Sequence, residues 1–197
     1  MADSLAPDHM RPLLRGRFGR REYRFEQCCP STQRLLGPDD VEGAVAVAEE
    51  QTEGRGRLGR VWQTPAGTGV LVSVLLRPAV PPPALPGLTL VAGRAVADAI
   101  REVAGLEPVI KLPNDVLLNG RKVAGILAES SDGRVVLGVG VNANQSAEQL
   151  PGDAQTEATS LAIELGRPVD RAELLAAVLA HLEQAYDRWV SDNAASG

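Results

Sequence analysis

One stretch restricts the possible fold classes more than any other part of the sequence: residues 107–144, EPVIKLPNDVLLNGRKVAGILAESSDGRVVLGVGVNAN. Apolar runs alternate there with two dipeptides, Asn119-Gly120 and Asp132-Gly133, which favour two-residue hairpin turns. Both central positions of such a turn need a positive φ, which Asn, Asp and Gly adopt readily. The stretch therefore predicts three strands in an antiparallel meander.

The rest of the chain mixes further strands with helices. Apolar periodicity and capping residues such as Asp170 mark these elements. We predict strands at 21–29, 43–51 and 69–78, and helices at 30–37 (capped by Ser31 or Thr32), from about Leu88 to Val103, within 156–166 and at 170–192. This order predicts an α+β fold, a mixed β-sheet flanked by helices, formed by residues 21–197. Residues 1–20, with scattered Pro, Gly and Arg, indicate a loosely ordered lead-in.

Composition limits the function classes. The 197 residues are 44% hydrophobic but only 3% aromatic, so Ala, Val and Leu must fill the core, and a net charge of −5 argues against a nucleic-acid binder. Cys28 and Cys29 are adjacent and are the only cysteines, which favours neither a disulfide nor a zinc site. No signal-peptide core and no membrane-length apolar run is present, so we expect a cytoplasmic, reduced protein without a membrane partner.

The sequence GRGRLGR at 54–60 concentrates arginines on a flexible backbone directly after a predicted buried strand. Glycines let backbone amides approach a ligand closely, and arginines form bidentate contacts to carboxylates or phosphates. The loop lacks the Gly-Lys-Ser/Thr ending of a Walker loop. It indicates an anion site, and the alternative is a solvated basic loop.

The sequence KLPNDV at 111–116 places Lys111, Asn114 and Asp115 in an otherwise apolar run. Pro113 removes a donor of the strand ladder, so we expect an edge strand or a kinked one. Polar side chains in such a run need partners or a ligand. The alternative is simply a polar edge strand.

Lys122 follows the Asn119-Gly120 turn. If the turn has two residues, Lys122 pairs with Leu117 and Asp115 pairs with Ala124, which makes Lys122 and Asp115 diagonal neighbours on one face. Such a pair indicates either a salt bridge or a reactive site, and in isolation the salt bridge is the commoner outcome.

The sequence GVGVNAN at 138–144 alternates glycine with valine. By the same counting, Gly125 lies opposite Gly140 and Leu127 opposite Gly138, which predicts a shallow floor poor in side chains. Glycine inside a strand marks the close approach of a ligand or another backbone. The alternative is packing against a helix.

Taken together, STQ at 31–33, EEQTEGRGRLGRVW at 49–62, KLPNDV, RKVAGILAE at 121–129 and GVGVNAN resemble the biotin protein ligases in order and spacing, over about residues 21–190. The resemblance implies a catalytic core like that of class II aminoacyl-tRNA synthetases. It implies that biotin and MgATP first give biotinyl-5′-AMP and that biotin then passes to a lysine of a biotin carboxyl carrier protein, usually that of acetyl-CoA carboxylase. A homodimer stays open.

The resemblance also implies roles for individual residues. Lys122, Arg57 and Asp115 would be catalytic, and Asp115 would bind magnesium. Biotin would contact Ser31, Thr32, Gln51, Gly54, Arg55, Arg57, Lys122, Gly125, Leu127 and Gly138. ATP would contact Arg60, Trp62, Lys111, Asn114 and Asn142. Because strict alternation would place Lys122 on the face opposite Gly125 and Leu127, these roles predict a local irregularity between Lys122 and Gly125.

The sequence departs from the family pattern at several points. Ser-Thr-Gln stands for the usual Ser-Thr-Asn, Leu112 stands for a tryptophan, and Gly69 stands for an asparagine. We expect neither an N-terminal DNA-binding module nor the usual C-terminal domain. A lipoate or octanoate ligase, and a non-catalytic domain that binds biotinyl-adenylate or a partner protein, stay open as alternatives.

Overall fold

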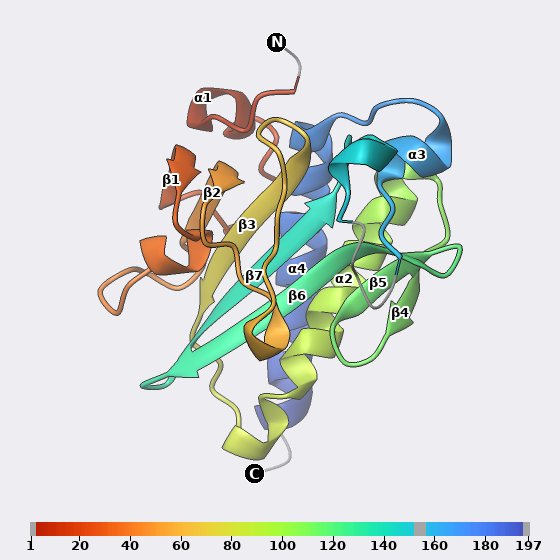
Figure 1. The fold of residues 1–197 in the computed structure, drawn as a ribbon. Coiled ribbons are helices and arrows are strands. Elements are labelled where there is room, and N and C mark those ends of the chain that lie inside the picture. Colours follow the sequence, from red (N-terminus) through yellow and green to blue (C-terminus); the bar gives the residue numbers. More distant parts are fainter. Residues whose placement is uncertain (1–2, 152–156, 195–197) are drawn as a thin grey trace.

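The computed structural model describes residues 3–151 and 157–194, and its centre is a seven-stranded mixed sheet in the order β1-β2-β3-β7-β6-β5-β4 (Figure 1). Only β1 and β2 pair in parallel; the other neighbours pair antiparallel. The strands are β1 (Tyr23–Cys29), β2 (Val45–Gln51), β3 (Gly69–Leu76), β4 (Val109–Lys111), β5 (Asp115–Leu118), β6 (Arg121–Ser131) and β7 (Arg134–Asn142). The predicted mixed sheet is therefore confirmed.

Residues 107–144 form a meander of four strands, so the prediction of three strands is wrong by one. Both hairpin turns have the predicted geometry, with φ of 50° at Asn119 and 51° at Asp132, each followed by a glycine at positive φ. The additional reversal lies within KLPNDV, where Lys111 pairs with Asp115 across a turn. Pro113 cannot donate to a ladder, which is why the run breaks there and β4 becomes the edge of the sheet.

A β-bulge separates Lys122 from Gly125. Leu117 pairs with Lys122 as predicted, but Val116 pairs with Ala124 and Asp115 with Gly125, and the register shifts between Val116 and Leu117. The predicted pairing of Asp115 with Ala124 is therefore wrong, because Val123 is an extra residue of β6. The predicted irregularity is confirmed.

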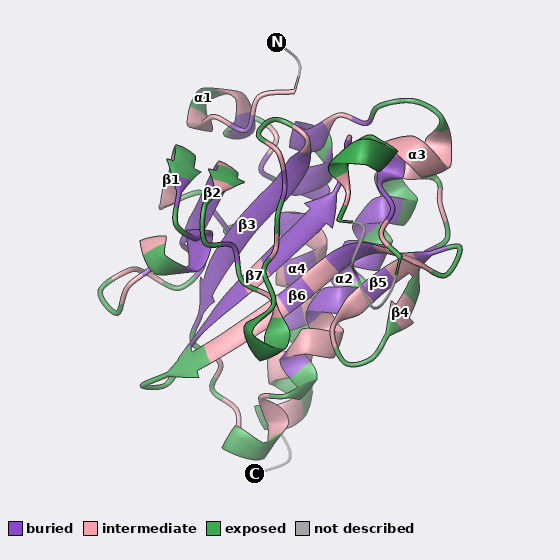
Figure 2. Ribbon diagram, viewed as in Figure 1, coloured by how far each residue is buried: buried purple, intermediate pink, exposed green. Residues whose placement is uncertain are grey.

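Helices cover one face of the sheet (Figure 1). The two long helices on this face are α2 (Gly87–Ala104) and α4 (Arg171–Ala194). Two further helices, α1 (Pro7–Met10) and α3 (Leu161–Leu165), are short. The Asp170 carboxylate accepts hydrogen bonds from the backbone N–H groups of Ala172 and Glu173, so its predicted capping role is confirmed. Ala, Val and Leu side chains dominate the core between sheet and helices, and β3 is buried along its whole length (Figure 2).

The N-terminal segment is docked on the domain, so the prediction of a loosely ordered lead-in is wrong for residues 3–20. Leu5, Met10, Leu14 and Phe18 are almost fully buried in the core. Their spacing was hidden among polar and helix-breaking residues. These side chains pack in the same cluster as Val45, Val47 and Tyr186, so the segment completes the core.

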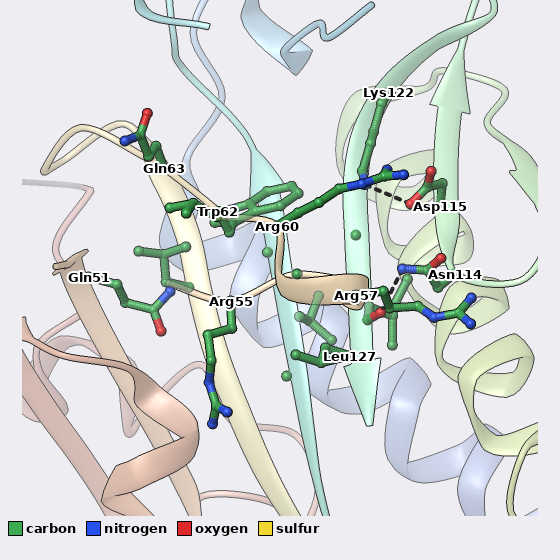
Figure 3. Close-up of a pocket in the computed structure, with 18 of the residues that line it drawn as sticks. Gln51, Arg55, Arg57, Arg60, Trp62, Gln63, Asn114, Asp115, Lys122 and Leu127 are labelled. Carbon is green, nitrogen blue, oxygen red and sulfur yellow. Dashed lines mark hydrogen bonds and ion pairs between the residues drawn. The ribbon is translucent and has the colours of Figure 1, made fainter. Parts of the chain in front are cut away.

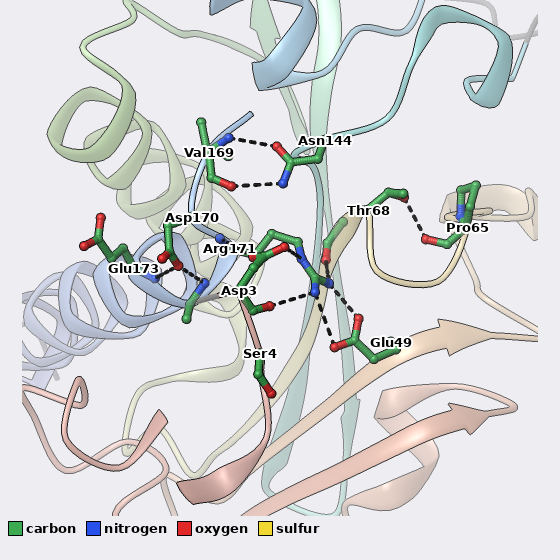
Figure 4. Close-up of polar contacts among 12 residues, drawn as sticks. Asp3, Ser4, Glu49, Pro65, Thr68, Asn144, Val169, Asp170, Arg171 and Glu173 are labelled. Carbon is green, nitrogen blue, oxygen red and sulfur yellow. Dashed lines mark hydrogen bonds and ion pairs between the residues drawn. The ribbon is translucent and has the colours of Figure 1, made fainter. Parts of the chain in front are cut away.

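Arg171 fastens this segment to the sheet (Figure 4). Its guanidinium, 5% exposed, pairs with Asp3 at 2.9 Å and with Glu49 at 2.6 Å, and it donates to the carbonyl oxygen of Gly69. Such a charge is tolerated inside a protein because its donors are matched by carboxylate and carbonyl acceptors.

No helix among the described residues is long and apolar enough to span a membrane. Both cysteines are free thiols, Cys28 exposed and Cys29 buried.

Candidate active site

The sheet face opposite α2 and α4 carries a pocket of about 1080 Å³. The chain between β2 and β3, which contains the Gly/Arg loop, crosses in front of β7 and β6 (Figure 1), and residues of the loop line the pocket. Every residue that the sequence predicted for the site lines this pocket except Gly54. These residues are Ser31, Thr32, Gln51, Arg55, Arg57, Arg60, Trp62, Lys111, Asn114, Asp115, Lys122, Gly125, Leu127, Gly138 and Asn142.

Glycines of β6 and β7 make the floor of the pocket. Gly125 pairs with Gly140 and Leu127 with Gly138, as predicted. A Cβ carbon would stand 2.5 Å from the Trp62 ring if built on Gly140, and 2.9 Å if built on Gly125. The indole therefore lies directly on the backbone of these strands. The floor is flat because glycine has no side chain to rise above the sheet.

Lys122 and Asp115 form an ion pair above this floor (Figure 3). The Lys122 Nζ lies 2.6 Å from a carboxylate oxygen of Asp115, with the two side chains 23% and 16% exposed. The same Nζ lies 5.5 Å from the centre of the Trp62 ring and 3.3 Å from a Cβ built on Gly125. The bulge thus brings Lys122 to the glycine face, and the predicted pairing of Lys122 with Asp115 is confirmed.

Hydroxyl and amide groups form a polar end. Thr32 Oγ1 lies 2.8 Å from Ser73 Oγ, and the Gln51 side-chain oxygen accepts from the Thr32 backbone N–H at 2.7 Å. Ser31 precedes a 3-10 turn at Thr32–Leu35 but its side chain caps no N–H group of the turn, and the Thr32 N–H is bound by Gln51, so the predicted capping role of Ser31 or Thr32 is wrong. Their side chains take part in the buried polar network or the pocket wall instead.

Gln33 is a pocket residue for which the sequence had predicted no contact. Its side-chain nitrogen donates to the carbonyl oxygens of Leu127 and Val136, both at 3.2 Å, and the amide covers Gly138 at 3.3 Å from a Cβ built there. The signal in the sequence was its place in the Ser-Thr-Gln motif, where the family has an asparagine.

The Gly/Arg loop has its own backbone bonds. Gly56 donates to the Arg60 carbonyl at 2.8 Å, and Trp62 donates to the Gly54 carbonyl at 2.9 Å. A Cβ on the buried Gly54 would collide with the Trp62 carbonyl, so glycine is needed there for the neck of the loop. Gly54 does not line the main pocket, and its predicted contact with biotin stays a prediction.

The arginines of the loop point in different directions. Arg55 is turned away from Lys122 (Figure 3) and pairs with Glu129 at 2.9 Å, both side chains 42% exposed. Arg57 starts a 3-10 turn, Arg57–Gly59, and reaches the Asn114 side of the pocket in the same view. Arg55 and Arg57 therefore lie on different sides of the pocket.

Two predicted nucleotide residues have amides that already bond within the protein. Asn114 Nδ2 donates to the Ile126 carbonyl at 3.0 Å, and Asn142 Nδ2 donates to the Thr159 carbonyl at 3.0 Å. Their predicted contacts with ATP stay predictions. Among the described residues of the pocket wall, Asp115 is the only carboxylate, and no group of three or more His, Cys, Asp or Glu gathers anywhere in the described chain.

A sequence pattern places this site in a known family. The pattern of the Biotin/lipoate A/B protein ligase family matches residues 27–146, which include the Ser-Thr-Gln turn, the Gly/Arg loop and the glycine floor. The chain belongs to this family. The ligase pattern thus covers most residues of the pocket wall, whereas Pro151 and Ala158 lie beyond it.

Individual ligases share much of the sequence. The bifunctional ligase/repressor BirA of Bacillus subtilis is 43% identical over 171 residues, which are 82% of this chain and 53% of that protein. The biotin–[acetyl-CoA-carboxylase] ligase of Mycobacterium tuberculosis is 42% identical over 165 residues, 81% of this chain and 60% of that protein. The chain thus spans little more than half the length of these curated relatives.

Solved ligase structures share the fold. The biotin protein ligase from Aquifex aeolicus in complex with biotin and ATP matches with a TM-score of 0.78 at 34% identity, over 87% of this chain and 72% of that chain. The Leishmania major ligase in complex with biotinyl-5-AMP matches with a TM-score of 0.69 at 26% identity, over 85% and 76%. The predicted fold class is therefore confirmed.

Proposed function

We propose that this chain activates biotin with ATP to biotinyl-5′-AMP and transfers biotin to a lysine of a biotin carboxyl carrier protein. One observation carries the proposal: the Lys122–Asp115 pair, 2.6 Å apart, stands above the glycine floor of the same pocket that holds the polar Thr32 and Gln51. The Aquifex aeolicus structure, which contains biotin and ATP, supports these substrates for a protein of the same fold.

The polar end of the pocket favours biotin over lipoate or octanoate. Biotin ends in a ureido ring with two N–H donors and one carbonyl acceptor, whereas a dithiolane ring or an alkyl chain offers neither. Thr32, Ser73 and Gln51 supply hydroxyl and amide groups that both donate and accept. A site built for hydrogen bonds rejects a ligand that leaves them unpaired.

In the first step, a carboxylate oxygen of biotin attacks the α-phosphorus of ATP. A new O–P bond forms, the bond from that phosphorus to the bridging oxygen breaks, and pyrophosphate leaves with the electron pair. Negative charge is shared between the two reactants in the transition state. The Lys122 ammonium, held on the sheet, and the Arg57 guanidinium, brought in by the loop, are the cations that stabilise this charge.

In the second step, the amine of the carrier lysine attacks the acyl carbon of the mixed anhydride. The amide bond forms, AMP leaves, and the amine releases a proton. The anhydride hydrolyses if water reaches it, so the Gly/Arg loop above Trp62 has to cover the adenylate until the carrier arrives.

Magnesium fits this pocket through a single carboxylate. Mg²⁺ keeps several waters and takes one or two carboxylates beside substrate phosphates. Asp115 matches this pattern, because it supplies a carboxylate to the wall of the pocket that would hold the phosphates. When bound with ATP, the ion would neutralise phosphate charge, and Asp115 would hold it while orienting Lys122.

The test is biotin-dependent exchange of radiolabelled pyrophosphate into ATP, followed by mass spectrometry of a biotin carboxyl carrier domain incubated with ATP and each acid. Exchange with biotin and a biotinyl mass increase support the proposal. Modification by lipoate or octanoate instead would identify the alternative ligase. Tight binding of biotinyl-adenylate without exchange would identify a non-catalytic binding domain.

A further inference from the structure

The backbone of Lys122 is held by a segment far away in the sequence. Its N–H donates to the Glu157 carbonyl at 2.7 Å, and its carbonyl accepts from the Thr159 N–H at 2.8 Å. Ala158, between them, makes a parallel bridge with Lys122 and lines the pocket. We call residues 157–160 the strap. Because Lys122 lies at the β6 bulge, the strap replaces part of the order that a regular ladder would supply.

Glu164 of α3 joins the strap to the hairpin that carries Lys122. Its carboxylate is 4% exposed and accepts three hydrogen bonds. Oε1 accepts from the Thr159 hydroxyl at 2.5 Å and from Arg121 at 2.7 Å, and Oε2 accepts from the Asn119 side chain at 2.7 Å. One buried carboxylate therefore connects Thr159 of the strap with Arg121 and Asn119, which directly precede Lys122 in its hairpin.

The other side of the strap is fixed to the end of β7. Asn142 donates to the Thr159 carbonyl at 3.0 Å, and the Ser160 hydroxyl donates to the Gln145 carbonyl at 2.7 Å. The strap therefore has a rigid anchor of its own. A shift of the Asn119–Arg121 turn relative to Thr159 would rotate Lys122 against a fixed reference, namely Asp115 and Trp62.

We propose that Glu164 is a positioning residue for Lys122. It lies outside the pocket wall and acts by holding the turn and the strap together, so that the Lys122 ammonium stays beside Asp115 and over Trp62. The inference rests on the proposed function, in which Lys122 stabilises the attack on ATP. Catalytic groups lose efficiency when their supporting hydrogen bonds are removed, even though no substrate contact is lost.

The test compares Glu164→Gln with Glu183→Gln, each in a Trp189→Phe background so that Trp62 is the single tryptophan and can be excited selectively. Glu183 is a matched control because its carboxylate, 15% exposed, also accepts from an arginine, Arg17, and from further donors, but lies on α4. Both changes remove charge from a poorly exposed acceptor and should lower the melting temperature. Pyrophosphate exchange is measured below that temperature, with kcat and KM for biotin determined separately.

Glu164→Gln should lower kcat about 10–100-fold with little change in KM for biotin, since a catalytic group is displaced and no substrate contact is removed. The emission of Trp62 should move toward that of Lys122→Met, in which the ammonium is absent. Glu183→Gln should change neither quantity. If Glu164→Gln does not fold, Thr159→Val, which removes one of the three hydrogen bonds, should show the same changes at smaller size.

A folded Glu164→Gln protein with wild-type kcat, or with wild-type Trp62 emission, overturns the inference and leaves Glu164 as a stabilising residue only. If the wild-type chain carries out no exchange, the proposed function fails. The emission of Trp62 then decides by itself whether Glu164 orients Lys122.

Discussion

The indole ring of Trp62 rests on Gly140, so closely that a Cβ carbon at Gly140 would stand 2.5 Å from the ring. The ring is held from a second direction, because Trp62 Nε1 donates to Thr64 Oγ1 at 3.0 Å. Trp62, which follows the Gly/Arg loop, is thus seated on β7. The position of Trp62, and of the loop before it, therefore depends on the absence of a side chain at Gly140.

Replacing Gly140 with alanine should unseat Trp62. The methyl group has no room beneath the ring. Because the ring belongs to a loop, it can swing away, and we expect the free energy of unfolding to fall by less than the usual cost of overpacking, which is about 1–3 kcal/mol. Biotin-dependent exchange should fall together with a change in Trp62 emission. Gly93→Ala in α2, where the new methyl would meet Ile110 at an ordinary 3.7 Å, is the control. Unchanged emission in Gly140→Ala would contradict the seating.

Lys122→Ala separates a salt bridge from a catalytic group. If the pair, with side chains 23% and 16% exposed, acts only as a salt bridge, its loss should cost on the order of 1 kcal/mol of stability, whereas losing one electrostatic contact of a transition state costs about 10²–10³ in rate. We expect a folded protein that has lost adenylate formation, and partial activity in Lys122→Arg, which keeps the charge but not the compact ammonium. Near-wild-type exchange in Lys122→Ala would reduce the pair with Asp115 to a structural one.

Biotin should protect the Gly/Arg loop from proteolysis. The exposed Arg55–Glu129 pair tethers the loop to β6 and contributes little in solvent. We expect trypsin to cleave after Arg55 and Arg57 more slowly when biotin or its adenylate is bound. Glu129→Gln should accelerate cleavage of the free protein and leave the ligand-bound protein less affected. Equal rates with and without ligand would speak against loop closure.

Arg171 should be among the most costly residues to truncate. In Arg171→Ala, Glu49 stays buried without its cation and the N-terminal segment loses Asp3 as an anchor. Removing one partner of a buried ion pair costs about 3–5 kcal/mol, which urea unfolding would measure. Arg188→Ala, an exposed arginine of the same helix, should change stability by less than about 0.5 kcal/mol. Similar midpoints for the two variants would refute the anchoring role.

Docking of the N-terminal segment should weaken in acid. The hydrogen bond from Arg17 holds the pKa of the Asp187 carboxyl below its ordinary value. A depressed pKa adds stability above the unfolded-state value and loses it as the pH falls through the folded-state value, so the loss should occur below about pH 4. Asp187→Asn should flatten the pH dependence of the melting temperature in this range. A parallel acid slope in wild type and Asp187→Asn would show that the pair contributes nothing.

Local chemistry in the sequence was enough to determine much of the sheet. Asn119-Gly120 and Asp132-Gly133 form the predicted turns, and from them the pairing of Gly125 with Gly140 follows by counting. The long helix ending at Gly105 and the cap at Asp170 were predicted from their own neighbours in the chain. These features depend on backbone preferences of adjacent residues, which tertiary contacts did not need to override.

Tertiary structure alone decided which groups meet in the site. The bulge at Val123 changes the partner of Asp115, and nothing in the local sequence specified whether Val123 or a neighbour would be the extra residue. Glu164 reaches the Lys122 hairpin across more than forty residues, and Arg171 reaches Asp3 across almost the whole chain. Such contacts form only when the elements pack. A charge that becomes buried must be paired with whichever polar groups lie next to it in the folded protein, and these can come from any part of the sequence.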